Sequence, residues 1–214
     1  MSDTSNNLPP QRHALADWQS RRLRQTYADL LADPRYHDAA TYFLSDLYGP
    51  HDFSLRDQQA ERVHAKLQRL LPKHLVAPMT NALELNTLSQ SLDQRLCEEL
   101  FDVMQVDSID DGNYCEAYRR CDNHAERQHQ IELMALIGHD LERVVTKPLV
   151  SSLLTLSRVP AQLAGLMELH QSLERGFHAF RSIGGASHFI DTVVEREQAI
   201  LDRIYAKHPD PLTL

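Results

Sequence analysis

Residues 83–100 read LELNTLSQSLDQRLCEEL, and most of their leucines recur at intervals of three and four residues. This spacing gathers the apolar side chains on one face of a helix, because an α-helix has 3.6 residues per turn. The stripe consists of Leu85, Leu88, Leu92, Leu96 and Leu100. Its regularity predicts a long amphipathic helix at the centre of the protein.

The composition of the whole chain points the same way. Only 7 of 214 residues are glycine, and runs rich in Val, Ile and Thr are nearly absent. Leu, Ala, Gln, Arg and Glu dominate instead, and no segment alternates apolar and polar residues as a strand would. We therefore predict an all-α protein, a single multi-helical bundle of about eight helices.

Prolines, glycines and capping residues divide the chain into these helices. We expect a disordered tail at residues 1–10, one helical domain at 11–207 and a C-terminal tail at 208–214. The acidic stretch 104–113 is the best linker candidate, but it is too short to define a domain boundary. The predicted helices span 11–32, 35–48, 54–71, a long segment between Pro72 and residue 104, 114–145, 149–157, 160–183 and 187–207. The two long central helices and a hairpin of the last two, joined at Gly184-Gly185, should form the core.

The net charge argues against a general affinity for polyanions. At −8, the chain has no global basic field that would attract nucleic acid or an anionic membrane. Arg21, Arg22 and Arg24 fall in QSRRLRQ, which indicates a solvated helix face, with a nucleic-acid patch as the alternative. Neither a membrane nor a nucleic acid is therefore expected as a partner.

Cysteine usage and the termini indicate the compartment. Cys97, Cys115 and Cys121 lack the Cys-x-x-Cys spacing of zinc or thiol-exchange sites, and three cysteines cannot all pair within one chain. They are typical of reduced thiols. No apolar stretch approaches the roughly 18 residues of a membrane span, and the polar N-terminus lacks a signal-peptide core. We expect a cytoplasmic protein.

The stretch TYFLSDLYGPHDFSLRD at residues 41–57 combines aromatic residues, a Gly-Pro pair and charges. Gly49-Pro50 suits the end of one helix, and Ser54 to Asp57 has the form of a capping box for the next. Upstream, the residues expected on the core face are Tyr36, Ala40, Phe43, Leu44 and Leu47, flanked by Tyr42 and Tyr48. The corner charges His51, Asp52, Arg56 and Asp57 would either pair and pin the corner or form a surface that a ligand or partner contacts.

The same stretch carries a family resemblance. YFLSDLYGP at residues 42–50, followed by Arg56-Asp57, resembles the signature of the bacterial FFLEELY-motif family of uncharacterised proteins, with Tyr42, Ser45 and Asp46 departing from it. The resemblance extends through ALELNTLSQSLD, ERQHQI, PAQLAGL and LERGFHAFRSIGGA. It implies one intact domain from about residue 11 to 207 and transfers no catalytic residue.

Two Glu-x-x-His pairs are the sharpest metal-binding pattern. Glu61 with His64, and Glu126 with His129, could each grip an ion from one helix face, as in ferritin-like di-iron proteins. Bridging carboxylates would also be needed, and Glu84 and Glu197 are the nominees. Because so short a motif also arises by chance, we expect no cofactor, with di-iron or haem as the alternative.

Three polar residues interrupt apolar stripes. His170, Glu197 and Gln128 each occupy a core position in a predicted helix, and a buried polar group needs a partner. If the last two helices form a hairpin, His170 and Glu197 would meet. The pair would be a core hydrogen bond, a polar spot in a subunit interface, or a ligand pocket or His–carboxylate dyad. Glu174 and His178 are expected to be a surface pair.

No catalytic residue can be nominated, since the chain has no phosphate-binding loop, nucleophile elbow or activated cysteine. The sequence therefore favours a non-enzymatic cytoplasmic helical interaction or regulatory protein whose partner is another protein or a second copy of itself. The alternative is a helical-bundle enzyme or sensor that binds a metal, haem or apolar ligand in its core.

Overall fold

The computed structural model describes residues 8–47, 49, 53–70, 73–184 and 186–214. Over these residues the chain forms ten α-helices and two short π-helical segments, with no strand, which confirms the all-α prediction. The elements are α1 (Pro10–Thr26), α2 (Ala28–Ala32), α3 (His37–Tyr42), η1 (Phe43–Leu47), α4 (Ser54–Leu70), α5 (Lys73–Glu98), η2 (Glu99–Val103), α6 (Asp111–Arg120), α7 (His124–Val145), α8 (Pro148–Leu163), α9 (Met167–Ser182) and α10 (Ser187–Tyr205).

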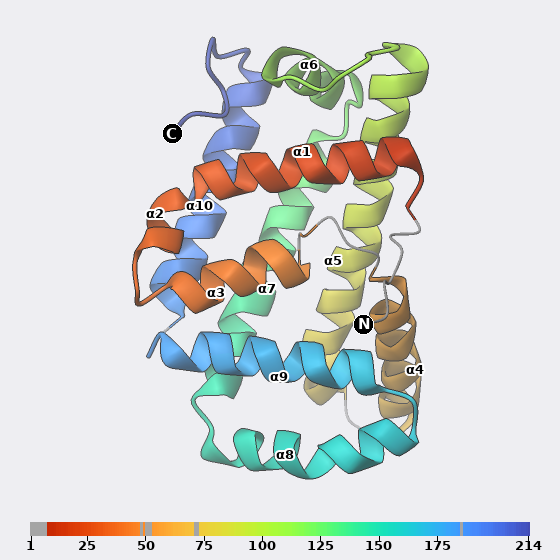
Figure 1. Cartoon of the computed structure of the whole chain (residues 1–214), viewed down its shortest axis with the longest axis vertical. Coiled ribbons are helices and arrows are strands. Elements are labelled where there is room, and N and C mark those ends of the chain that lie inside the picture. Colours follow the sequence, from red (N-terminus) through yellow and green to blue (C-terminus); the bar gives the residue numbers. More distant parts are fainter. Residues whose placement is uncertain (1–7, 48, 50–52, 71–72, 185) are drawn as a thin grey trace.

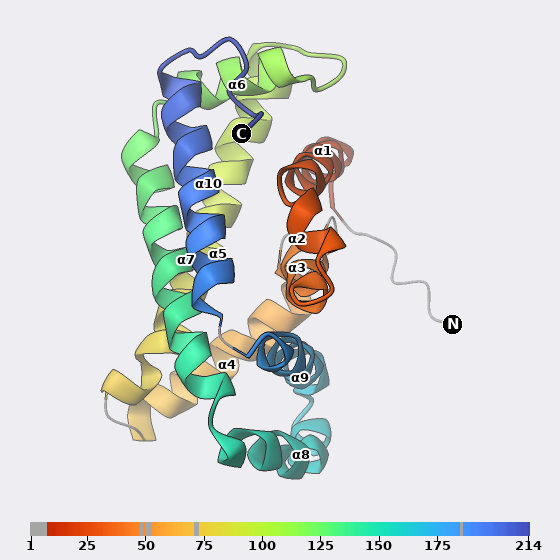
Figure 2. The same cartoon turned by 90° about the vertical axis from the view of Figure 1, so that its left-hand side faces the viewer.

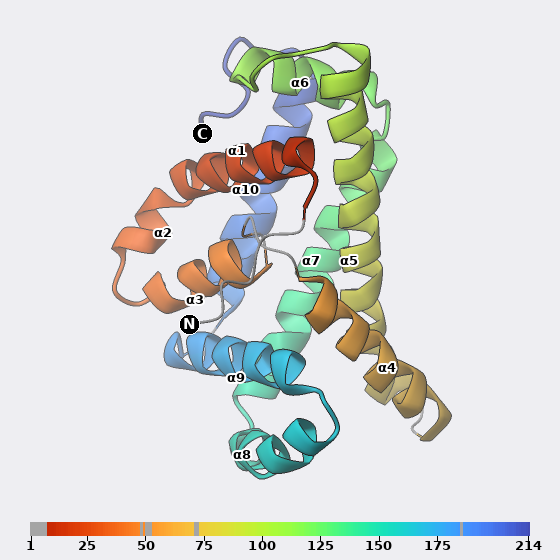
Figure 3. The same cartoon turned by 45° about the vertical axis from the view of Figure 1, so that its right-hand side comes forward.

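The helices form two layers (Figures 1 and 2). The long helices α5, α7 and α10 run along the long axis, with α7 packed against both of the others. Helices α1, α3 and α9 cross this layer, while α6 covers one end of the molecule and α8 lies at the other. Helix α4 extends obliquely from the corner after η1 and packs on α5 and α9 (Figure 3).

Two apolar clusters fill the space between the layers. One joins α3 and η1 to α9 and α10, and includes Phe43, Phe177 and Phe189. The other joins α1, α5, α6 and α10, where Leu96 and Leu100 are fully buried. The leucine stripe, which begins in α5 and ends at Leu100 in η2, is thus central, although its earlier members Leu85 and Leu88 remain partly exposed.

Several helix boundaries differ from those predicted, because single residues interrupt the helices. Tyr27 separates α1 from α2, and Asp122, with φ of 47°, separates α6 from α7. Positive φ is tolerated by Asp better than by most residues, and it ends a helix. Helix α8 continues through Pro160, where a new helix was expected to begin, and it ends before Gly165, which has φ of 67°.

The expected hairpin of the last two helices is wrong. Gly184 has φ of 71° and supports a turn between α9 and α10, but the two helices cross at a steep angle instead of lying antiparallel (Figure 1). Their apolar residues converge on the same cluster at the corner, where Phe180 meets Phe189 edge to face with ring centroids 5.7 Å apart. Residues distant from the corner, such as His170 and Glu197, are therefore not brought together.

The segments expected to be a linker and a tail both contact the body. Met104, Val106 and Ile109 of the acidic 104–113 stretch pack against the second cluster, as does Leu212 near the C-terminus. Asp110 begins α6 with a reciprocal capping box to Asn113. The linker candidate is therefore part of the same core.

Candidate interaction surface

Helix α8, PLVSSLLTLSRVPAQL, is unlike the other long helices in its charge. It contains no acidic residue, and its only basic residue is Arg158. Thr155 and Ser157 satisfy their hydroxyls on α8's own backbone, donating to the carbonyls of Ser151 and Leu154. These two hydroxyls therefore need no hydrogen-bond partner outside α8.

The outer face of α8 carries an apolar stripe that the described part of the chain leaves uncovered. Its five large side chains are more than half exposed, at 68% for Leu149, 55% for Leu153, 73% for Leu156, 63% for Val159 and 85% for Leu163. Their spacing of three and four residues places them on one side of the helix. We call these five residues the α8 stripe. Figures 1 and 2 show no other element beyond this end of the molecule.

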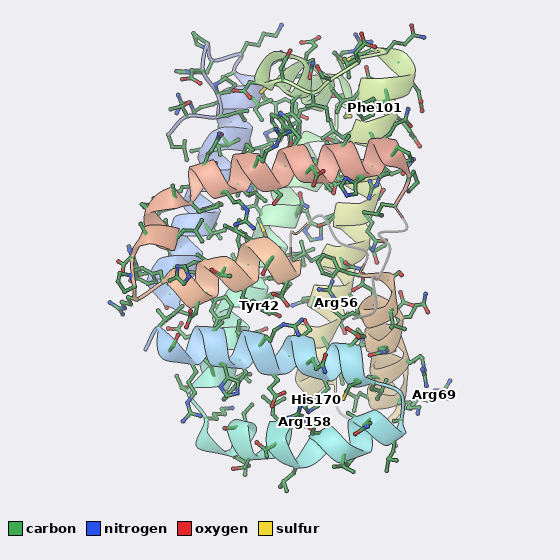
Figure 4. The ribbon with its side chains drawn as sticks, in the orientation of Figure 1. Tyr42, Arg56, Arg69, Phe101, Arg158 and His170 are labelled. Carbon is green, nitrogen blue, oxygen red and sulfur yellow. The ribbon has the colours of Figure 1, made fainter. Side chains whose placement is uncertain are left out.

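The inner face of α8 is attached to α9. Val150 and Leu154 pack against the first apolar cluster. His170 of α9, which is 5% exposed, donates from Nε2 to the backbone carbonyl of Leu154 at 2.9 Å. Figure 4 shows His170 in the space between α9 and α8. The sequence-predicted candidate His170 is therefore a core histidine that fixes the position of α8.

The second ring nitrogen of His170 is less well satisfied. Nδ1 has no hydrogen-bond partner among the described residues, and Glu174 Oε2 lies 4.0 Å away. The carboxylate that approaches His170 is thus that of Glu174, one turn on in the same helix, and not that of Glu197.

Glu197 binds a different set of residues on α1 and at its end. Arg22 donates both terminal nitrogens to the carboxylate at 2.8 and 3.2 Å, and the Tyr27 hydroxyl donates at 2.8 Å. Burial opposes the charge of Arg22, but the Glu197 carboxylate outweighs it and raises the pKa of Arg22 above its ordinary value. The predicted His170–Glu197 pair is therefore wrong, and Arg22 faces inward although it was expected on a solvated face.

The polar residue buried in α7 is Arg127, where Gln128 was predicted. Gln128 is only half-buried, while Arg127 is 5% exposed. The Arg127 guanidinium lies 4.4 Å from the ring centroid of Tyr118, and it donates to the Leu92 carbonyl over 3.4 Å. The prediction treated 114–145 as one helix, and the break at Asp122 shifts the register of the residues that follow.

A pocket lies elsewhere, between the end of α1, α2, α10 and the C-terminal segment. Its volume is about 450 Å³. Its lining consists of Gln25, Thr26, Ala28, Asp29, Arg196, Leu212, Thr213 and Leu214. None of the three polar-core candidates His170, Glu197 and Gln128 lines it.

At the corner, Arg56 and Asp57 connect three elements. Arg56 donates to the Asp46 carbonyl at the end of η1 and pairs with Asp57, whose carboxylate also accepts from Asn86 of α5 at 3.0 Å. Arg175 of α9 reaches the Asp46 carboxylate at 2.6 Å. Both Arg56 and Asp57 are mostly buried, so these contacts hold η1, α4 and α5 together at the corner. Figure 4 shows Arg56 near α4. The candidates His51 and Asp52, and Tyr48 and Pro50, lie outside the described residues.

The core-face prediction for this segment holds with one exception. Tyr36, Ala40, Phe43 and Leu44 are buried, whereas Leu47 is 43% exposed. Because η1 is a π-helical turn, it has more residues per turn than an α-helix, and Leu47 is displaced from the face that Phe43 and Leu44 share. The Tyr42 ring packs against Gly176, where a Cβ atom would come within 2.7 Å of it.

The four metal candidates are engaged separately. His64 Nε2 lies 2.8 Å from the Thr80 hydroxyl, and His129 Nε2 lies 2.8 Å from Glu84 Oε1. The Glu126 carboxylate accepts hydrogen bonds from both terminal nitrogens of Arg95. Glu61 is exposed. Within the described ranges no three His, Cys, Asp or Glu side chains form a group that could hold a metal ion. Among the described residues, the two Glu-x-x-His pairs therefore do not come together as the four-residue set of the di-iron alternative.

The comparison with protein families concerns nearly the whole chain. A family model described as a domain of unknown function, DUF8198, matches residues 1–211. The chain belongs to the DUF8198 family. Every element from α1 to α10 lies within the DUF8198 match, including the corner and α8. Comparisons with curated proteins and with solved structures found no match.

The thiols of this DUF8198 chain do not have the environment of nucleophiles. Cys97 and Cys115 are buried and Cys121 is half-buried, all three without a disulfide. Burial raises the pKa of the Cys115 thiol to about 11 and that of the other two above its ordinary value. A higher pKa lowers the thiolate fraction, which is the reactive form.

A membrane span was not found. None of the described helices of the DUF8198 chain is both long enough and apolar enough to cross a bilayer.

The α8 stripe was missed at the sequence level. The prediction ended this helix at Ser157 and started another at Pro160, which divided the stripe between two helices. Its signal was nonetheless in the sequence, as large apolar residues at helical spacing over residues 149–163 with no acidic residue among them.

Proposed function

We propose that this protein is a non-enzymatic cytoplasmic interaction protein, of the bacterial FFLEELY-motif type, that docks on a protein partner through the outer face of α8. The observation that carries the proposal is the α8 stripe. Isolated exposed leucines are normal on protein surfaces, but a contiguous apolar stripe is a mark of an interaction site. The cytoplasmic location and the bacterial origin are part of the proposal.

Two features of the fold support a docking role for this helix. The His170 hydrogen bond and the contacts of Val150 and Leu154 hold α8 on α9, so the stripe is presented on an attached helix. An amphipathic helix that lays its apolar face against a partner is a common recognition mode. The outer face is also uncharged, so docking would leave no buried charge unpaired.

Site-specific photo-crosslinking in cells tests the proposal. A benzophenone amino acid replaces Leu156, and the matched control replaces Glu195, an exposed residue of α10. We expect a crosslinked product of discrete mass from the Leu156 site that the Glu195 site does not give. Equal or absent crosslinking at the two sites would overturn the proposal.

The alternative, a bundle that binds a metal, haem or apolar ligand, has its own test. Metal analysis and an absorption spectrum of the freshly purified protein give the answer directly. Stoichiometric iron or a haem absorption band would replace the interaction proposal with the sensor or enzyme.

A further inference from the structure

The α8 stripe is symmetric about Leu156. Leu153 and Val159 lie three residues to either side of Leu156, and Leu149 and Leu163 lie seven residues to either side. The exposed fractions follow the same order on both arms, with the outer residues at 68% and 85% and the inner ones at 55% and 63%. Reversing the direction of the helix therefore leaves the pattern of exposed apolar residues unchanged.

A two-fold axis performs this reversal. In an isologous contact the same surface is used by both copies, so residue i meets j and residue j meets i. An antiparallel α8 pair centred on Leu156 would set Leu156 against its own copy, Leu153 against Val159, and Leu149 against Leu163. The stripe spans about 21 Å at 1.5 Å per residue, which is long enough for a helix-packing contact. Resting on the proposed function, we infer that the partner of α8 is α8 of a second copy of this chain.

The charge distribution permits two copies to meet at α8. Each copy has a net charge of −8, so two copies repel one another wherever acidic residues face each other. Helix α8 has no acidic residue at all. Arg158 lies two positions from Leu156, about 200° around the helix, and is therefore on the opposite side of α8 from the centre of the stripe. The two arginines would therefore stay out of the contact.

The exposed area suits a modest dimer. Given their exposed fractions, the five side chains present on the order of 500 Å² of apolar surface per copy. Two copies would bury on the order of 1,000 Å² together, which is the lower limit for a specific interface. We expect a dimer whose dissociation constant is on the order of 10 μM, because burial of this size must offset the lost freedom of two bodies.

Sedimentation velocity of the full chain over a concentration series measures this equilibrium. We expect the monomer to convert to a dimer, and Leu156→Glu to raise the dissociation constant at least about 100-fold, because it sets two carboxylates against each other at the axis. The matched control is Leu70→Glu, an equally exposed leucine of α4, 77% exposed, which should leave the dimer unchanged. Circular dichroism is used to check that both variants fold.

Engineered cysteines test the geometry independently. In a Cys121→Ser background, Leu156→Cys places one thiol at the axis of the pair and should give a disulfide-linked dimer on mild oxidation. Arg158→Cys, on the other side of the helix, should form the same non-covalent dimer as the wild type but no disulfide-linked dimer. A wild-type chain that stays monomeric up to about 300 μM overturns the inference, as does equal crosslinking by the two variants. If the purified chain is monomeric while Leu156 crosslinks to a different protein in cells, the homodimer is wrong and the proposed docking function stands.

Discussion

Replacing Glu197 with Gln should expose the energetics of the buried ion pair between α1 and α10. The substitution keeps the shape of the side chain and removes its charge. In the native structure the carboxylate accepts from two Arg22 nitrogens and from the Tyr27 hydroxyl. The variant leaves the Arg22 guanidinium with no carboxylate in this contact, in a position where both side chains are only 14–15% exposed.

The size of the effect follows from this burial. Removing one partner of a buried ion pair lowers the free energy of unfolding by about 3–5 kcal/mol, because the remaining charge stays desolvated. The Gln carbonyl can still accept one hydrogen bond and some solvent reaches the pair, so we expect a loss of about 2–3 kcal/mol. The double variant Arg22→Met with Glu197→Leu removes both charges and should unfold within about 1 kcal/mol of the wild type.

Urea unfolding followed by circular dichroism measures these differences. The control is Asp29→Asn, which breaks the pair of Asp29 with Arg196, one position before Glu197 on α10. Asp29 is 60% exposed, so its loss should lower the free energy of unfolding by less than about 1 kcal/mol. If Glu197→Gln is no more destabilising than Asp29→Asn, the description of Glu197 as the partner of a buried charge is wrong.

Three further predictions concern the contacts around α9 and α10. Gly176→Ala should lower the free energy of unfolding by about 1–3 kcal/mol, since its Cβ would meet the Tyr42 ring at 2.7 Å, and Tyr42→Leu in the same chain should recover part of the loss in urea unfolding. The Ser187 hydroxyl donates to the Glu142 carboxylate at 2.6 Å and lowers the pKa of that carboxyl from 4.5. The stability that this hydrogen bond adds is therefore present above pH 4.5 and is lost as the pH falls through the lower pKa that Glu142 has in the folded state. Glu142→Gln should therefore be less stable than the wild type at pH 7 and equal to it well below pH 4, as pH-dependent unfolding will show. His170→Leu should speed hydrogen exchange in α8 more than in α5, since it removes the donor that holds α8; unchanged exchange in α8 would contradict that role.

The fold class was predictable because it depends on local pattern. Helical spacing of apolar residues, the scarcity of glycine and the positions of proline identify where helices form. The predicted helix boundaries were less accurate where a single residue decides whether the helix ends. Asp122 and Gly165 both follow helix ends with positive φ; glycine adopts that conformation readily, but no local feature of the sequence distinguishes Asp122 from other polar residues. The resulting shift in register moved the buried polar position from Gln128 to Arg127.

The candidate site was only partly predictable, since it depends on how helices cross. Glu197 was recognised as a polar residue within an apolar stripe, and it does take a mostly buried position. Its partner Arg22 lies 175 residues away in the chain, and no local feature of QSRRLRQ distinguishes the inward-facing arginine from its exposed neighbours. The assumption of an antiparallel hairpin made His170 the predicted partner of Glu197 instead. That assumption failed because a turn in the sequence does not specify the angle between the helices that it joins.

Two leucine stripes illustrate what each level of description decides. The sequence by itself determined that both α5 and α8 carry large apolar residues at three- and four-residue spacing, since that spacing is a property of the chain. Only the tertiary structure decided that Leu96 and Leu100 are covered by α1, α6 and α10, while Leu156 and Leu163 are left at one end of the molecule. The physical reason is that burial depends on contacts between segments far apart in the chain, and the helix pattern does not encode which of its faces another helix will reach.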